Sequence, residues 1–319
     1  MELIMHAARR ILSTVLVALG VTVLSFLLIR IAPGEPAQMI AGARYGDENL
    51  TDELVEKVRV EEKLYKPIHE QYLSWMKELL HGDMGESILT GKSVAYEIKT
   101  SLPTTFKLSI SAMLVSVMLA IPLGAAAAAD YGRPGDRIIT VSSMLCESMP
   151  CFWLALLLII CFAVKLHWLP AFGAGSIKHM ILPALSLGIG MTAVTLRLTR
   201  AHMLEALSQD YIKTAKGKGL KQSSVVISHA LKNALIPVVT MLGLQFAHLM
   251  EGAVVVESIF GLPGMGKLLV DAIFARDYEL IQGCVLSFAF IVVFINIGLE
   301  IIYGLIDPRI KTGRRGSNA

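Results

Sequence analysis

The residues best suited to act on another molecule lie in a polar, basic stretch between two long apolar segments. This stretch covers Asp210–Asn233. Tyr211–Lys216 is long enough for about two turns of helix, and Asp210 is placed to cap it. Gly217 and Gly219 are expected to end the helix, because glycine tolerates the left-handed conformation that a helix C-terminus needs. The stretch therefore predicts a short, exposed helix.

A second short helix is expected to begin at the serine pair 223–224 and to run to Asn233. Two short helices around a glycine, beside apolar segments, are typical of a docking surface. The alternative is a generic basic loop, which the positive charge of inner membrane loops alone would produce. The spacing favours docking, because Gly219 follows Ala215 by four residues and His229 follows ten residues later.

Polar side chains inside apolar segments form a second group, since they are costly in a membrane and mark transport pathways. The candidates for lining a pathway are Glu147, Gln245, His248 and Glu251. The alternative for each is a structural partner within the protein, and His248 and Glu251 lie three apart, where they can pair. A nickel site at His248 with Met241 or Met250 is disfavoured. We expect neither a metal site nor a cofactor.

The composition indicates a helical membrane protein. Hydrophobic residues make up 54% of the 319 and charged residues 17%, whereas soluble domains carry about 25% charge. Six apolar runs are each close to the roughly 20 residues that cross a bilayer. They are Ile11–Ile29, Leu108–Ala129, Ile138–Val164, Met180–Leu196, Ala234–Val256 and Leu280–Ile306. We therefore expect an all-α polytopic membrane protein with six transmembrane helices.

Lysine and arginine in the short loops predict the orientation of the chain. Most of them fall on one side, together with the basic stretch. The other side holds Lys165, Lys178, Lys267 and Arg276. Both termini are therefore expected in the cytoplasm (N-in, C-in). The net charge of +3 reflects this asymmetry and does not indicate nucleic-acid binding.

We expect the chain to divide into four segments. Residues 1–31 form a cytoplasmic N-terminus and the first transmembrane helix, and residues 32–101 form an extracytoplasmic insertion. Residues 102–306 form a five-helix transmembrane core that contains the basic loop at 204–233, and residues 307–319 form a cytoplasmic tail. The insertion should be helical, with one helix starting at Thr51–Leu54 and an amphipathic helix at Ile68–Leu80. Packing is favoured over substrate contact for the apolar stripe of the second helix, which consists of Tyr72, Trp75, Met76 and Leu79.

A glycine-rich segment at Gly261–Lys267 matches most of a phosphate-binding loop. The match fails at Leu268, because a hydroxyl is needed there to reach a magnesium ion. The segment also falls on the outer side by the charge pattern. We expect a re-entrant turn between the fifth and sixth helices, and no ATPase activity in this chain.

The basic stretch resembles the cytoplasmic EAA loop of ABC-importer permeases, and the chain as a whole resembles the peptide/nickel branch of that family. Further segments carry the resemblance, in the family's order and over nearly the whole chain. They are Gln71–Ser87, Met149–Leu154, Gly252–Gly266, Arg276–Tyr278 and Asp307–Arg309. One departure narrows the branch: Lys232 stands where the general loop has a proline, and Pro237 comes later.

This resemblance implies a type I importer permease fold in a bacterial or archaeal cytoplasmic membrane. It implies that the chain is non-catalytic and works with a second permease, two cytoplasmic ABC ATPases and an extracytoplasmic binding protein. The short helix would dock in a groove of an ATPase. The apolar contacts of this helix with the ATPase would be Tyr211, Ile212, Ala215 and Leu220. Lys216 and Lys218 would form the polar rim of the contact. The coupling loop would also include Gly219, His229 and Asn233.

Other functions remain open at this point. An ion-coupled secondary transporter would need ionisable groups at a repeat interface, and no repeat is visible. A structural membrane scaffold is a third alternative. The cargo is either a short peptide or a nickel chelate, and the compact outer loop Lys165–His179 resembles nickel-type members somewhat more.

Overall fold

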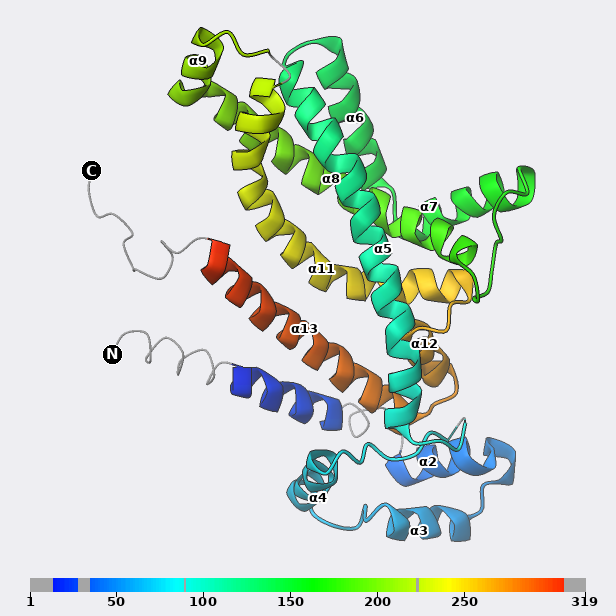
Figure 1. Cartoon of the computed structure of the whole chain (residues 1–319). Helices are drawn as coiled ribbons and strands as arrows, with labels where there is room; N and C mark the ends of the chain where they lie inside the picture. Colours follow the sequence, from blue (N-terminus) through cyan, green and yellow to red (C-terminus); the bar gives the residue numbers. More distant parts are fainter. Residues whose placement is uncertain (1–13, 28–34, 89, 222–223, 307–319) are drawn as a thin grey trace, which may run out of the picture. The chain divides into compact units, whose positions relative to one another are not determined.

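The computed structural model describes residues 14–27, 35–88, 90–221 and 224–306. Within these ranges the chain is helical, with no β-strand and one isolated bridge between Glu86 and Ser93 (Figure 1). The contacts divide the chain into two compact units. Unit 1 comprises residues 1–104 and 263–294, and unit 2 comprises residues 105–262 and 295–319.

Several helices are long and apolar enough to cross a membrane, as the composition predicts. In the described ranges four pass this test alone, and up to six do if each of two bent helix pairs counts as one span. The four are Val94–Ala129, Ile177–Ser208, Val225–Met250 and Tyr278–Leu299. The predicted first span is described only as the shorter apolar helix Thr14–Leu27, and its ends lie outside the described residues.

Helix α5 (Val94–Ala129) begins inside the segment assigned to the insertion. Its 36 residues correspond to a length of about 54 Å, whereas the hydrocarbon core of a bilayer is about 30 Å thick. The helix is therefore longer than one span, and the boundary expected at residue 102 stays a prediction. Leu102-Pro103 suggested a helix start, but a proline is also tolerated within a long helix when neighbouring groups satisfy the backbone.

The predicted third span is not one straight helix. Helix α6 (Pro134–Ser148) ends, and α7 (Cys151–Leu158) continues into a π-helical segment η2 (Ile159–Lys165) after a bend of 102° (Figure 1). Pro150 causes the break, since proline has no N–H and pushes the preceding Met149 into an extended conformation. The backbone of Met149 has φ −83° and ψ 127°.

A second bend follows helix α11 (Lys232–Phe260). The chain turns by 77° into α12 (Met265–Phe274), as in a re-entrant loop or a broken span. Gly261 ends α11 at φ +65°, a left-handed conformation that glycine adopts without strain. The Leu262 N–H donates to the Glu257 carbonyl at 2.9 Å and closes the turn.

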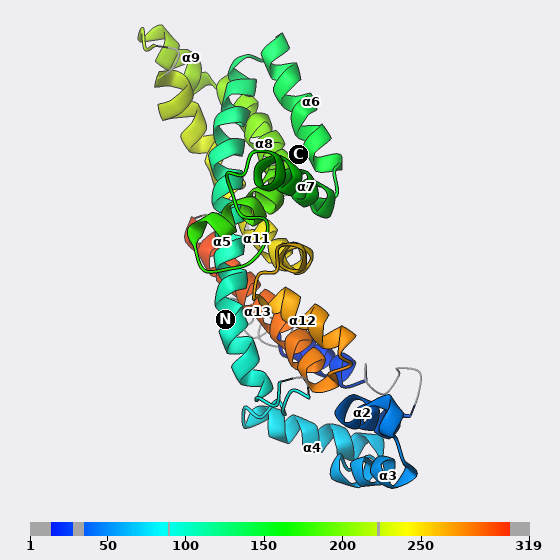
Figure 2. The same cartoon turned by 90° about the vertical axis from the view of Figure 1, so that its right-hand side faces the viewer.

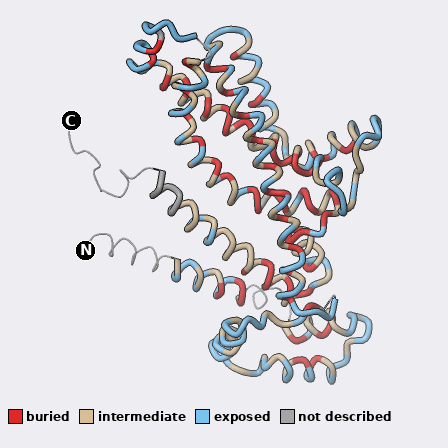
Figure 3. The backbone as a smooth tube through the Cα atoms, viewed as in Figure 1, coloured by how far each residue is buried: buried red, intermediate tan, exposed pale blue. Residues whose placement is uncertain are grey.

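Helix α8 (Ile177–Ser208) is the centre of unit 2 and contacts α6, α7 and α11. Buried positions recur along it (Figure 3). Two glycines allow close approach to α5: a Cβ at Gly188 would lie 2.6 Å from the Ala112 carbonyl oxygen, and one at Gly124 2.8 Å from that of Leu196. The packing of α5 on α8 therefore depends on residues without side chains.

The insertion in unit 1 contains three helices, α2 (Pro36–Tyr45), α3 (Asp52–Glu61) and α4 (Ile68–Leu80). Both views show α2 beside α3 (Figures 1 and 2). The sequence predicted α3 and α4 but missed α2. Thr51 caps α3 by accepting a hydrogen bond from the Leu54 N–H at 3.4 Å, as its residue type predicts.

The apolar stripe of α4 packs against the helix Thr14–Leu27. The rings of Tyr72 and Trp75 lie 5.2 Å and 5.7 Å from that of Phe26. The Tyr72 hydroxyl is hydrogen-bonded to the Thr22 hydroxyl at 2.9 Å. The prediction that this stripe is a packing surface is confirmed for these two aromatic residues.

Candidate functional site

The predicted short helix is present as α9 (Asp210–Gly217). Asp210 is its first residue and not a cap outside it, and its carboxylate lies 2.8 Å from the Lys213 ammonium. Gly219 follows at φ +78°, as expected for a glycine that ends a helix. This helix is connected directly to α8, which ends at Ser208.

The predicted second short helix is not separate. Residues Val225–Leu231 form a π-helical segment, η3, that runs without a break into α11. Both views show α9 beside this segment (Figures 1 and 2). The basic stretch thus joins the ends of two long helices, α8 and α11, through one short helix.

One face of α9 is buried in unit 2. Ile212 and Ala215 are 0% and 6% exposed, and they pack with Met203, Val225 and Ala230. Sequence reasoning placed Ile212 and Ala215 among the contacts to a partner, which is wrong, because their side chains are already covered by the chain itself. They fasten α9 to the ends of α8 and η3.

The other face of α9 is open. Tyr211 is 41% exposed and Leu220 is 42% exposed, and Ile227 on η3 is 63% exposed. Asn233 donates a hydrogen bond to the Tyr211 hydroxyl at 3.1 Å and another to the His229 carbonyl at 3.0 Å. Nothing in the sequence pattern distinguished Ile227.

Apart from Asp210, which pairs with Lys213, the charged side chains of α9 and of the segment after it are basic. Lys213, Lys218, Lys221 and Lys232 are exposed, whereas the side chain of Lys216 lies outside the described residues. Together with the open apolar residues Tyr211, Leu220 and Ile227, they form a surface that we call the basic face. An apolar centre with a charged surround is the usual arrangement of a protein interface.

Two ion pairs fasten α6 to α8 beside this region. Arg200 donates two hydrogen bonds to Asp136, at 2.6 and 2.8 Å, and Asp136 is only 4% exposed. Glu147 is held by Arg197 through two hydrogen bonds, one of them 2.9 Å long. Glu147, a pathway candidate in the sequence, therefore has a structural partner.

The other pathway candidates lie on α11. Gln245 is 7% exposed and accepts a hydrogen bond from the Thr195 hydroxyl at 2.8 Å, so it ties α11 to α8. His248 is exposed on this chain. The side chain of Glu251 lies outside the described residues, so the predicted pairing of Glu251 with His248 stays a prediction. Among the described residues, no three His, Cys, Asp or Glu side chains cluster as metal ligands would.

In unit 1, two of the segments that carry the family resemblance meet. The Ser87 hydroxyl donates to the buried Asp277 carboxylate at 2.7 Å, and the Glu86 N–H donates to Glu279 at 2.7 Å. Gly85 has φ +83°, and a Cβ there would collide with the Glu279 carboxylate. These residues join the insertion to the start of α13 (Tyr278–Ile306), a contact that sequence reasoning missed because the partners are about 190 residues apart.

Arg44 on α2 adds a charge cluster to this junction. It forms ion pairs with Glu62, with Glu61 at 3.5 Å and with Glu279 at 3.6 Å. Partial burial lowers the pKa of the Arg44 guanidinium, but the carboxylates, above all Glu62, offset this effect and leave the pKa above its ordinary value. The junction is therefore held by a guanidinium that stays charged.

Comparison with known families identifies the class of this protein. Residues 120–312 match the family described as the binding-protein-dependent transport system inner membrane component, and residues 3–109 match the N-terminal region of such membrane components. The chain belongs to this family.

Curated relatives agree over nearly their full length. The chain is 38% identical to the di/tripeptide transport system permease protein DppB of Pseudomonas aeruginosa, covering 96% of this chain and 98% of that protein. It is 39% identical to the glutathione transport system permease protein GsiC of Escherichia coli (strain K12), with the same coverage. The chain is thus a non-catalytic permease subunit of the ABC-importer class, and ATP hydrolysis belongs to a separate subunit. This membership sets the ion-coupled and scaffold alternatives aside.

Solved structures show the same fold at low identity. A chain of an amino acid ABC transporter, in a structure with histidines, matches with a TM-score of 0.52 at 15% identity, over 65% of this chain and 92% of that one. A chain of the MetNI methionine ABC transporter, in an inward-facing conformation, matches with a TM-score of 0.57 at 14% identity. This match covers 66% of the present chain and 97% of the MetNI chain.

Proposed function

We propose that this chain forms half of a membrane pathway that imports short peptides, with a second homologous permease as the other half. An extracytoplasmic binding protein delivers the peptide, and two cytoplasmic ATPases dock on the permease pair and drive the cycle. Membership in a binding-protein-dependent family supports the binding protein as a partner. The proposed location is the cytoplasmic membrane of a bacterium or archaeon.

The observation that carries the coupling role is the division of α9 into a buried and an open face. Ile212 and Ala215 anchor the helix in unit 2, while Tyr211 and Leu220 remain open. A helix held in this way moves with the ends of α8 and α11 and transmits a displacement of the docked ATPase to two long helices. The coupling loop at 204–233, including Lys216, Gly219, His229 and Asn233, is therefore proposed as the ATPase contact, without Ile212 and Ala215 as contact residues.

Short peptides are proposed as cargo in preference to a nickel chelate. The relatives that cover the chain almost completely are named as di/tripeptide and glutathione permeases. The compact outer loop favoured nickel in the sequence, but loop length is a weak criterion, because insertions in surface loops cost little free energy.

The test is the ATPase activity of the complete complex in liposomes, with its binding protein loaded with dipeptides, tripeptides, glutathione or nickel chelates. We expect stimulation by the peptide-loaded binding protein and accumulation of peptide in the vesicles. Stimulation by nickel chelates alone would overturn the peptide proposal. Failure of the chain to co-purify with any ATPase would overturn the partner proposal itself.

The basic face can be tested in the same preparation. Replacing Leu220 with Glu places a charge at its apolar centre and should reduce ATPase binding about tenfold or more. Glu53→Gln, an exposed substitution on α3 and outside the coupling loop, serves as the control and should leave binding unchanged. Equal binding by both variants would place the docking surface elsewhere.

A further inference from the structure

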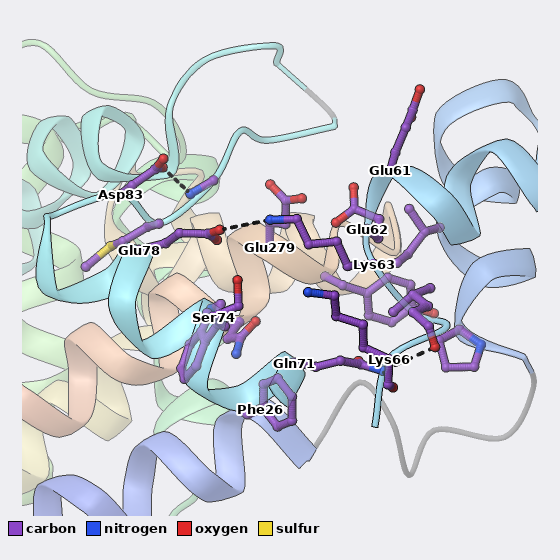
Figure 4. A pocket seen from close by; sticks show the side chains of 18 of the residues that line it. Phe26, Glu61, Glu62, Lys63, Lys66, Gln71, Ser74, Glu78, Asp83 and Glu279 are labelled. Carbon is purple, nitrogen blue, oxygen red and sulfur yellow. Dashed lines mark hydrogen bonds and ion pairs between the residues drawn. The ribbon is translucent and has the colours of Figure 1, made fainter. Parts of the chain in front are cut away.

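A cavity in unit 1 lies between the insertion and the first turns of α13. Its volume is about 190 Å³. Residues from α3, α4, the segment after α4 and the start of α13 line it (Figure 4). Glu61 and Lys63 are exposed at its rim, so the cavity communicates with the outside. The volume is sufficient for a small organic molecule.

Gln282 on α13 lines this cavity and has a buried side-chain donor without a hydrogen-bond partner. It is only 8% exposed, and its side-chain Nε2 has no hydrogen-bond partner. A buried donor left without an acceptor costs about 1–3 kcal/mol. Such a group persists where a ligand or water supplies the acceptor. Gln71, which also lines the cavity, differs, because its amide donates to the carbonyls of Leu64 and Lys66.

The charges around the cavity are mainly negative. Five carboxylates line it, from Glu61, Glu62, Glu78, Asp83 and Glu279. Lys63 pairs with Glu78 at 3.7 Å, and Arg44 is shared by Glu61, Glu62 and Glu279. Even with Lys66 counted, the carboxylates exceed the cations by two. Figure 4 shows Glu62 and Glu279 on the same side of the cavity.

Aromatic residues also contribute to the wall of the cavity. Phe26 and Trp75 line the cavity, and their ring centres are 5.7 Å apart. An apolar wall with a few oriented polar groups is typical of a small-molecule site. Among the described residues, the carboxylates do not cluster as metal ligands would, which favours an organic cation over a metal ion.

We propose that this cavity binds the unblocked amino-terminal end of a short peptide on the outer side of the permease. The ammonium group lies among the carboxylates of Glu62 and Glu279. The Gln282 amide, whose Nε2 has almost no accessible surface in this structure, turns so that a peptide carbonyl oxygen accepts its unused hydrogen bond. A side chain of the peptide packs on Phe26 and Trp75. Glu279 and Gln282 are three residues apart and lie on one face of α13. They can therefore contact the ammonium group and the adjacent carbonyl oxygen of one peptide. The inference rests on the proposed peptide import and adds a holding site outside the pathway.

The test measures binding of radiolabelled dialanine to the purified complex in nanodiscs, without the binding protein. We expect saturable binding of dialanine and at least about tenfold weaker binding of N-acetyl-dialanine, which has no ammonium group. Gln282→Leu and Glu62→Gln should each weaken dialanine binding about tenfold. Glu53→Gln, an exposed carboxylate on α3 outside the cavity, is the matched control and should bind as the wild type does.

Stability distinguishes ligand binding from a structural role for Gln282. Because its donor has no partner, Gln282→Leu should melt at or above the wild-type temperature. Equal binding of dialanine and N-acetyl-dialanine, or unchanged binding in both cavity variants, would overturn the inference. If either of these binding results is found while peptide import in liposomes is intact, only the inference about the cavity is overturned, and the proposed function is not. Absence of import with dialanine binding intact would instead overturn the proposed function alone.

Discussion

At the scale of single residues, polar groups in this chain fasten helices to one another. Asp136 and Glu147 on α6 each hold an arginine of α8, and Gln245 on α11 holds Thr195. Sequence reasoning read Glu147 and Gln245 as candidates for lining a pathway. Both have partners within unit 2, which agrees with the structural alternative for a polar residue in an apolar segment.

The Asp136–Arg200 pair gives the first prediction. Asp136→Asn should lower the free energy of unfolding by about 2 kcal/mol or more, because Arg200 then keeps its charge without a carboxylate. Unfolding of the purified protein by titration with a denaturing detergent measures this change. Asp130→Asn, in the turn before α6, removes a surface pair with Arg133 and should change this free energy by no more than about 0.5 kcal/mol. Equal losses of unfolding free energy in the two variants would show that burial of the Asp136–Arg200 pair does not increase its contribution to stability.

At the scale of elements, close helix packing depends on glycine. Gly188 and Gly190 both lie on α8, but only Gly188 approaches the backbone of another helix. We predict that Gly188→Ala lowers the free energy of unfolding by about 1–3 kcal/mol, since α5 and α8 must separate. Gly190→Ala, with nothing within 4 Å of its added Cβ, should be neutral or stabilising. Thermal unfolding of each variant, followed by size-exclusion chromatography, would measure the difference in stability between them.

The end of α9 gives the second prediction at this scale. Gly219→Ala places a side chain at φ +78° and costs about 1–2 kcal/mol, so the exit of the chain from α9 should change. We expect weaker stimulation of the ATPase by the loaded binding protein. Gly217→Ala, on the last turn of α9, should preserve stimulation, because alanine favours helix. If Gly219→Ala stimulates as the wild type does, the geometry of this turn is not part of coupling.

At the scale of the whole molecule, the remaining prediction is the orientation across the membrane. The distribution of Lys and Arg predicts that the basic loop faces the cytoplasm and that the insertion faces the outside. A membrane-impermeant thiol reagent should label a cysteine at Glu53 in intact cells, in a variant without native cysteines. A cysteine at Lys213 should be labelled only in inside-out vesicles. The reverse pattern would contradict both the orientation and the location of the ATPase contact.

The sequence by itself determined the features that depend on local chemistry. The apolar composition and run lengths indicate a helical membrane protein, because a spanning segment must satisfy its own backbone. Thr51 marks the start of α3, the apolar spacing of Ile68–Leu80 marks α4, and Gly219 marks the end of α9. Each of these signals acts within one or two turns of helix.

Tertiary structure decided what depends on distant residues. The burial of Ile212 and Ala215 follows from packing on η3 and α8, and no spacing within the basic stretch reveals it. The 102° bend at Pro150 could equally have been a mild kink, because a proline's effect depends on what satisfies the freed carbonyls. The cavity around Gln282 exists only because the insertion meets the start of α13 about 200 residues later. Pairings at such separations come from packing and not from local pattern, which is why the sequence alone did not predict them.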